Sequence, residues 1–153
     1  MDMTGEHRIF APRETVWAAL NDAEVLRVCI PGCEELEKKS DTELSALVVQ
    51  KIGPVKAKFR GDVELSNINA PASYTIRGEG SGGVAGFAKG GADVSLSEDG
   101  TETVLSYEVQ ATVGGKLARL GSRLIDSTAK KLAAQFFDNF QAHLNEAEAK
   151  PAE

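Results

Sequence analysis

The sequence has 153 residues and a formal net charge of −6, with 42% hydrophobic and 26% charged residues. This is the composition of a globular domain with one hydrophobic core, and its acidity excludes a general nucleic-acid binder, which would carry a basic face. No apolar run reaches the roughly 20 residues of a membrane-spanning helix and no signal peptide is visible, so we expect a cytoplasmic protein.

The N-terminal third predicts one strand and two short helices. Residues 3–11 alternate weakly, which predicts a strand. Pro12 marks its end, since the residue before a proline avoids helical angles and a helix can therefore begin only after that point. The next stretch, "PRETVWAALND" (12–22), predicts a helix whose inner face carries Val16, Trp17 and Leu20. A second helix starts after Asp22 as its N-cap and ends at Pro31-Gly32.

From residue 33 to residue 113 the pattern has a period of two, which is typical of antiparallel strands with one buried face. The clearest case is "VKAKFRGDVEL" (55–65), where apolar or small residues alternate with charged ones. Turn signals separate the segments. The predicted strands are 33–38, 43–52, 55–65, 73–80, 84–97 and 105–113.

The last part of the chain predicts one long amphipathic helix over 115–147, followed by a polar tail. Leucine and phenylalanine recur there at helical spacing. A curved sheet must cover one of its faces, and this helix is the only element long enough to do so. We therefore expect an α+β helix-grip domain over 1–146, with about seven antiparallel strands wrapped on the long helix, two short helices after the first strand, and a tail at 147–153.

Seven of the fifteen glycines lie in "GEGSGGVAGFAKGG" (78–91). A phosphate-binding loop is excluded because neither a Gly-Lys-Ser/Thr step nor a helix follows. Small residues on the inward face would leave a space below the helix, and a mostly apolar cavity of this kind can hold a small molecule. The alternative is that the glycines permit a bulge or tight coiling of the sheet.

Five blocks of the sequence form a recognisable combination: "PRETVWAALND", "IPGCEEL", "KIGPVKAKFRGDVEL", "GSGGVAGFAKGGADVSL" and "TVGGKLARLGSRLI". Together they resemble the carbon monoxide dehydrogenase G-subunit (CoxG) family, which belongs to the START-like, polyketide-cyclase-like (SRPBCC) helix-grip superfamily. The resemblance covers residues 2–145.

The resemblance implies an accessory protein of a molybdenum hydroxylase system and not an enzyme. Such a protein would carry a hydrophobic acceptor such as a quinone or another lipid to the dehydrogenase, or recruit the dehydrogenase to the membrane. Longer members of the family continue into an extension that attaches to membrane. This sequence stops at "EAKPAE", so we expect reversible, peripheral contact with the inner face of the membrane.

We expect the cavity between the long helix and the sheet to be lined by aromatic and aliphatic side chains. Phe87 belongs there only if a glycine bulge turns it inward. An alternative function is a cyclase or dehydratase that uses the pocket tyrosines or His7, and another is a general lipid carrier. The expected lining residues are Trp17, Phe59, Tyr74, Ile76, Phe87, Tyr107, Leu117, Leu120 and Leu124.

The two cysteines, Cys29 and Cys33, flank Pro-Gly and are interpreted as structural. A redox pair and half of a metal site are the alternatives, but the chain offers only His7 and His143 as further soft ligands, at no metal-site spacing. We expect no metal and no cofactor.

Residues 115–131 carry five cations and one acid in an otherwise acidic chain. At 100° per residue four of the cations share one stripe of the predicted long helix. This stripe is a candidate docking surface for anionic lipid or an acidic partner, and a solvated helix face is the alternative. The four residues are Lys116, Arg119, Arg123 and Lys130.

Overall fold

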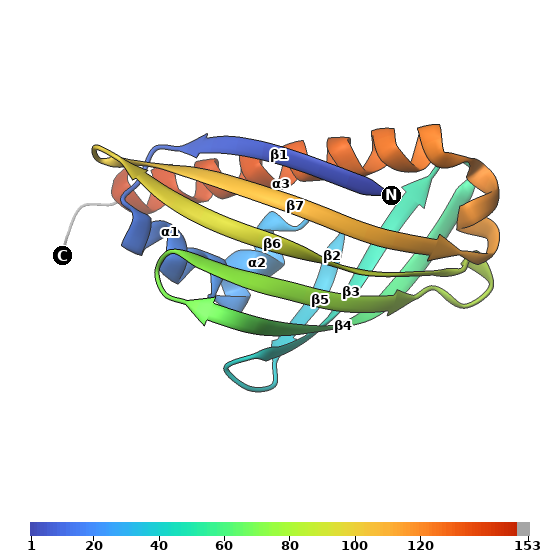
Figure 1. Cartoon of the computed structure of the whole chain (residues 1–153). Coiled ribbons are helices and arrows are strands. Elements are labelled where there is room, and N and C mark those ends of the chain that lie inside the picture. Colours follow the sequence, from blue (N-terminus) through green and yellow to red (C-terminus); the bar gives the residue numbers. More distant parts are fainter. Residues whose placement is uncertain (150–153) are drawn as a thin grey trace.

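The computed structural model describes residues 1–149 and contains a single antiparallel sheet with a long helix along one face (Figure 1). The seven strands lie in the order β1-β7-β6-β5-β4-β3-β2, so the first and last strands of the sequence are neighbours. This confirms the predicted α+β helix-grip fold. The strands are β1 Asp2–Ile9, β2 Cys33–Lys38, β3 Glu43–Ile52, β4 Val55–Asn69, β5 Ser73–Ser81, β6 Phe87–Asp99 and β7 Glu102–Gly114.

Apolar and polar residues alternate along these strands, and the register aligns the apolar ones into rows across the sheet. One such row pairs Leu65 with Ile76, Ile76 with Ala92 and Ala92 with Val109. Its members point to the face that the helix covers, which we call the inward face, while their charged neighbours along each strand point outward. A one-residue slip would exchange the two faces, so burial fixes this register.

Two short helices, α1 (Arg13–Leu20) and α2 (Ala23–Cys29), follow β1 as predicted. The carboxylate of Asp22 caps α2, because it accepts hydrogen bonds from the backbone N–H groups of Glu24 and Val25 at 2.9 and 3.3 Å. The chain then turns at Gly32, whose φ is +76°. A Cβ at this position would lie 2.1 Å from the carbonyl oxygen of Val49, so only glycine allows this close approach.

The C-terminal segment differs from the single helix predicted over 115–147. Residues Gly115–Leu120 form a short 3₁₀ helix, η2, and Gly121 has a φ of +90°. The long helix α3 begins only at Ser122 and runs to Ala149. The left-handed backbone at Gly121 breaks the helix because L-residues avoid that region. The predicted tail, 147–153, thus begins inside α3, and residues 150–153 lie outside the described part of the chain.

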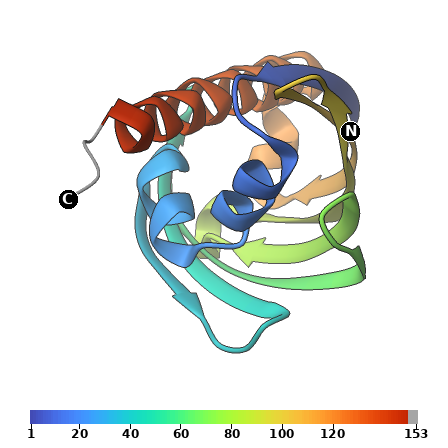
Figure 2. The same cartoon turned by 90° about the vertical axis from the view of Figure 1, so that its left-hand side faces the viewer.

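The hydrophobic core occupies one end of the domain. Figure 2 looks from that end and shows α1 and α2 lying in the mouth of the curved sheet, beside α3. The buried residues of α1, of α2 and of the C-terminal half of α3 pack there against the ends of the strands. The core includes Val16, Leu20, Cys29, Val94, Leu96, Leu105, Phe140 and Leu144.

Candidate functional site

The inward face away from the core is made largely of glycine and alanine. Two adjacent rows cross β3 to β7 there, and most of their members have no side chain beyond Cβ. The first row is Ala46, Gly61, Gly80, Ala88 and Val113, and the second is Leu44, Val63, Gly78, Gly90 and Ala111. We call these two rows the small-residue floor.

Burial changes abruptly along the inward face. Tyr74, Val94 and Leu96 are 7%, 7% and 3% exposed and belong to the core. One row further from the core, Ile76, Ala92 and Val109 are only partly buried although they point at the helix side. The partial exposure continues over the floor and on α3, at Ile125 and Leu132. Solvent therefore reaches these inward-pointing residues in part, whereas the row of Tyr74 is buried.

Four predicted lining residues, Phe59, Tyr74, Ile76 and Tyr107, do lie on the inward face. The ring of Phe59 covers Gly82, since a Cβ there would lie 2.6 Å from a ring carbon. The ring of Tyr107 leans over Gly5, where a Cβ would lie 2.3 Å from the hydroxyl. These two glycines let large rings lie flat at the margins of the floor.

Tyr74 stands at the buried end of the inward face, beside Trp17 of α1. The two rings meet edge to face, with centroids 5.3 Å apart. Burial raises the pKa of Tyr74 to about 12, so its hydroxyl stays protonated and is a hydrogen-bond donor at physiological pH. The same burial makes it a poor general base for the alternative enzymatic function.

Three aromatic rings wall the β1 side of the space. The ring of His7 stacks on that of Phe137 from α3, with centroids 4.0 Å apart, and Tyr107 lies 5.9 Å from Phe137. His7 thus acts as an aromatic spacer between sheet and helix. Strand alternation predicts that His7 lies on the same face as Ile9. It does not predict the contact with Phe137, because the two residues are far apart in the sequence.

Three predicted lining leucines gather at the end opposite the core. Leu117 is buried in η2. Leu120 and Leu124 lie at the turn between β3 and β4, because a Cβ on Gly53 would be 4.0 and 3.0 Å from their methyl carbons. They come from two separate helices, η2 and α3, and not from one continuous helix as expected.

Phe87 does not lie with the other predicted lining residues. No register shift occurs in β6, so strand alternation puts Phe87 on the outward face opposite Gly114. Its ring covers Gly114 and is 42% exposed. The glycine bulge that an inward Phe87 would require is absent from this strand. The prediction that Phe87 lines the cavity is therefore wrong, and Phe87 is a surface residue.

The break at Gly121 also divides the predicted basic stripe. Lys116 and Arg119 belong to η2, whereas Arg123 and Lys130 belong to α3, so the calculated 100° spacing does not connect the two pairs. All four are exposed. Within the described part of the chain, no helix combines the length and apolar character needed to cross a bilayer.

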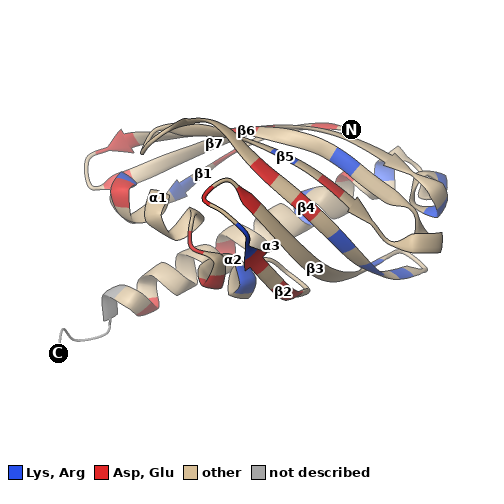
Figure 3. Ribbon diagram, turned by 90° about the horizontal axis from the view of Figure 1, so that it is seen from below, with Lys and Arg blue, Asp and Glu red and all other residues tan. Residues whose placement is uncertain are grey.

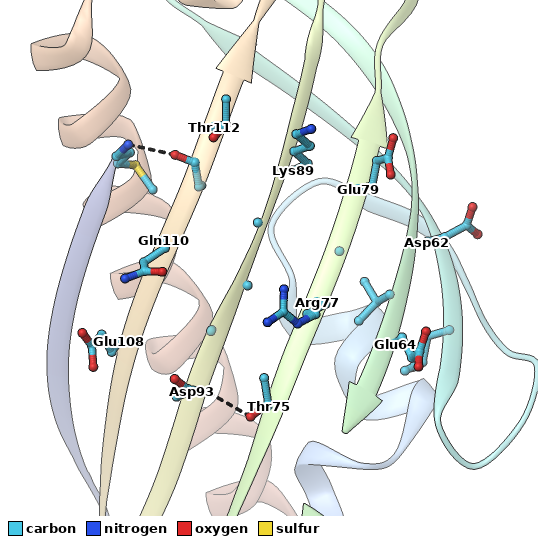
Figure 4. Close-up of a pocket in the computed structure, with 18 of the residues that line it drawn as sticks. Asp62, Glu64, Thr75, Arg77, Glu79, Lys89, Asp93, Glu108, Gln110 and Thr112 are labelled. Atoms are coloured by element: carbon cyan, nitrogen blue, oxygen red, sulfur yellow. Dashed lines mark hydrogen bonds between the residues drawn. The ribbon is translucent and has the colours of Figure 1, made fainter. Parts of the chain in front are cut away.

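A broad concavity lies on the opposite, outward face of the sheet (Figure 4). It measures about 1070 Å³, and its lining includes the charged residues Arg77, Lys89 and Glu108. One row of the small-residue floor also borders it: Leu44, Val63, Gly78, Gly90 and Ala111. Thr75 donates a hydrogen bond of 2.8 Å to Asp93 within it. Its charges are of both signs and it opens broadly to solvent, so it is unsuited to enclosing an apolar molecule. Strand alternation alone predicts only that these charged residues lie on the wet face.

Both cysteines are free thiols, and Cys29 is only 1% exposed. Burial raises the pKa of each thiol, and the raised pKa keeps them protonated at neutral pH. Cys33 donates a weak hydrogen bond from Sγ to the carbonyl oxygen of Glu35, at 3.3 Å. Among residues 1–149 no three His, Cys, Asp or Glu side chains cluster as a metal site requires.

Comparison with known proteins identifies the family. The family model for the G-subunit of carbon monoxide dehydrogenase (CoxG) matches residues 5–145. No curated protein matches the sequence.

Solved structures share the whole fold. A conserved protein from Geobacillus kaustophilus is 30% identical, with a TM-score of 0.90 over 96% of this chain and 97% of that one. A START superfamily protein from Mycobacterium smegmatis has a TM-score of 0.74 at 12% identity, over 95% and 98% of the two chains. A protein from Arthrobacter aurescens has a TM-score of 0.69 at 18% identity, over 99% and 88%. The chain therefore belongs to the carbon monoxide dehydrogenase G-subunit (CoxG) family and has a START-like fold.

Proposed function

We propose that this protein carries a hydrophobic small molecule, such as a quinone or another lipid, for a molybdenum-hydroxylase dehydrogenase of the carbon monoxide dehydrogenase type. Membership of the CoxG family supports a dehydrogenase of this type as the partner. The inward face supports the cargo, which would lie between the small-residue floor and α3. The protein itself performs no chemistry in this proposal, so it shows no turnover of cargo in the absence of the dehydrogenase.

One observation carries the proposal: apolar, inward-pointing residues remain partly exposed between sheet and helix. Residues such as Ile76 and Leu132 would normally be covered in a domain of this size, because interiors pack to about the density of organic crystals. Filling the space with an apolar ligand would remove this area from water, at about 25 cal/mol for each Å². Among the inward positions of the described strands the one cation is Lys38, at the end of β2, which pairs with Leu44 and donates a hydrogen bond of 3.2 Å to the carbonyl oxygen of Asn21.

The test is native mass spectrometry of the purified protein, followed by organic extraction and identification of what is released. We expect a co-purifying apolar molecule in a one-to-one complex. In a second step, the protein loaded with that molecule is added to a molybdenum-containing carbon monoxide dehydrogenase, and substrate-dependent reduction of the cargo is followed. A protein that takes up no apolar compound, even when compounds are added, would refute the carrier function.

We also propose that the end of the domain opposite the core contacts anionic membrane. Val84 is 84% exposed in η1 (Gly83–Ala85), the 3₁₀ turn between β5 and β6, and η1 packs against η2. Figure 3 shows Lys and Arg gathered at this end of the sheet. The exposed cations are Lys51, Lys56, Lys58, Arg60, Lys116, Arg119 and Arg123.

An exposed apolar side chain surrounded by cations suits the surface of an anionic bilayer, where each cation contributes about 1 kcal/mol. Of these cations only Lys58 has an acidic partner among the described residues, Glu34 at 4.0 Å. Co-sedimentation with vesicles of anionic and of neutral lipid, at low and high salt, tests this surface. We expect binding to anionic vesicles at low salt only, and equal binding to both lipids would contradict it.

A further inference from the structure

The segment before α3 has the sequence pattern of a helix but not the conformation of one. Leu117, Leu120 and Leu124 recur at helical spacing across Gly121. The structure nevertheless breaks at Gly121, where φ is +90°. Crowding does not force this break, because no atom of the described residues lies within 4 Å of a Cβ built on Gly121. The chain therefore carries the pattern for two backbone conformations, one broken and one continuous.

The 3₁₀ helix η2 is weakly held in the broken conformation. Of its six residues only Leu117 is buried, at 3% exposure, and Leu117 is not part of the core cluster. At the end of η2 the backbone N–H of Gly121 donates a long hydrogen bond of 3.4 Å to the carbonyl oxygen of Ala118. Elements with few buried apolar contacts open at a low cost in free energy. We therefore expect that η2 can leave its place while the core stays folded.

In this place η2 lies across the end of the domain opposite the core, where Figure 1 shows it in orange. There η2 meets η1 backbone to backbone. A Cβ on Gly86 would lie 2.1 Å from the carbonyl oxygen of Gly114, and a Cβ on Gly115 would lie 2.6 Å from the Cα of Gly86. Leu120 reaches the turn between β3 and β4 beside Gly53. Removal of η2 from η1 would thus uncover this end of the inward face.

The charges of the segment favour the continuous conformation on an anionic surface. At 100° per residue the four cations of the predicted basic stripe fall within about 60° of one another, but only if the helix runs through residue 121. Leu120 and Leu124 would then border the stripe. Leucines beside cations are typical of a helix that lies in the interface of an anionic bilayer. The bilayer thus has the higher affinity for one conformation that a shift of the equilibrium requires.

We propose that η2 and the start of α3 form a gate that an anionic membrane opens. In the free protein the chain is broken at Gly121, and η2 covers the end of the inward face. On the membrane, residues 115–121 join α3 as one continuous helix, η2 leaves η1, and the apolar cargo passes between the bilayer and the space under α3. This inference rests on the proposed carrier function and membrane surface, and it adds how the site opens.

The first experiment opens the gate without a membrane. Two histidines four positions apart lie on one face of a helix and bind nickel together only where the chain between them is helical. In Arg119→His/Arg123→His, nickel should therefore favour the continuous helix. We expect it to speed the release of preloaded Nile red, followed by stopped-flow fluorescence, by about fivefold or more. Lys130→His/Ala134→His places the same pair inside α3 and should bind nickel with no change in the release rate.

The second experiment changes the hinge itself. Alanine avoids the positive φ of Gly121 and is a better helix former than glycine, so Gly121→Ala favours the continuous helix in two ways. We expect both the release rate of Nile red and the affinity for anionic vesicles to rise about tenfold. Gly100→Ala is the matched control and should change neither. Gly100 has a φ of +64° and equally open surroundings, but it lies in the turn between β6 and β7.

The outcomes separate the gate from the functions on which it rests. Nickel that binds the pair across Gly121 without speeding release, or that binds only the control pair, would overturn the gate and leave the carrier function standing. Unchanged vesicle affinity in Gly121→Ala, with the wild type bound to the vesicles, would overturn the membrane as the trigger. A wild type that binds no anionic vesicles loses the membrane surface and the trigger together, and one that takes up no Nile red loses the carrier function and the gate.

Discussion

Trp17 and Tyr74 meet edge to face, with ring centroids 5.3 Å apart and ring planes at 86°. Trp17 comes from α1 and Tyr74 from β5, so this contact joins the first helix to the middle of the sheet. It also marks the boundary between the packed core and the partly exposed floor. Because Trp17 is the only tryptophan of the chain, its emission reports directly on this boundary.

Replacing the tryptophan should loosen α1 from the sheet. We expect Trp17→Leu to lower the free energy of unfolding by about 2 kcal/mol, since the side chain is partly buried and the aromatic contact is lost. Trp17→Phe, which keeps an aromatic edge, should cost less than half as much. Urea unfolding followed by circular dichroism measures both, and equal losses in the two variants would argue against the edge-to-face contact.

A second prediction concerns the buried hydroxyl that ties β7 to the start of α1. Thr103 is fully buried, and its Oγ1 donates a hydrogen bond of 2.8 Å to the carbonyl oxygen of Ala11. Thr103→Val should destabilise the domain by about 1–3 kcal/mol, because it leaves this carbonyl unpaired. Thr103→Ser keeps the donor and loses only a methyl group. If the Thr103→Val variant unfolds at the same temperature as the wild type, the hydrogen bond contributes nothing to the stability of the domain.

The proposed membrane surface predicts the effect of an acidic substitution at its tip. Val84→Asp should reduce binding to anionic vesicles at least fivefold, because it adds a negative charge and removes the exposed apolar group. Val28→Asp is the matched control, since Val28 is also exposed, at 48%, but lies on α2 near the core end. Equal losses in the two variants would show that net charge alone governs binding.

The thiols should titrate above the range of free cysteine. Burial raises the pKa of Cys33, so less thiolate is present at any given pH, and alkylation should become fast only at higher pH than for free cysteine. Iodoacetamide labelling followed by mass spectrometry across pH 7 to about 11 measures the midpoint. A midpoint below that of free cysteine would revive the redox interpretation of the two cysteines.

Most of the fold follows from local patterns in the sequence. Alternation defines the strands, Asp22 signals the start of α2, and Pro31-Gly32 marks its end. The break at Gly121 was missed because Leu117, Leu120 and Leu124 continue the helical spacing across it. A single glycine in such a pattern is tolerated in many helices, and only the backbone angle of +90° reveals the break.

The candidate site could be predicted only in part. Alternation correctly placed Phe59, Tyr74, Ile76 and Tyr107 on one face. It could not show that Trp17 lies against Tyr74 or that His7 stacks on Phe137, because these contacts join distant segments. The burial of the Tyr74 row depends on how far α1 reaches over the sheet, which is a property of tertiary packing.

The central claim, that an apolar molecule lies on the small-residue floor, is tested most directly by filling that floor. A Cβ at Gly80 would meet its nearest atoms at 3.8 Å, so Gly80→Leu fits the backbone and projects its side chain into the space. The matched control is Glu79→Val, on the outward face of the same strand. We predict that Gly80→Leu binds Nile red at least tenfold more weakly than the wild type at undiminished thermal stability, while Glu79→Val binds it normally. Undiminished binding in Gly80→Leu, with the variant folded, would contradict the account.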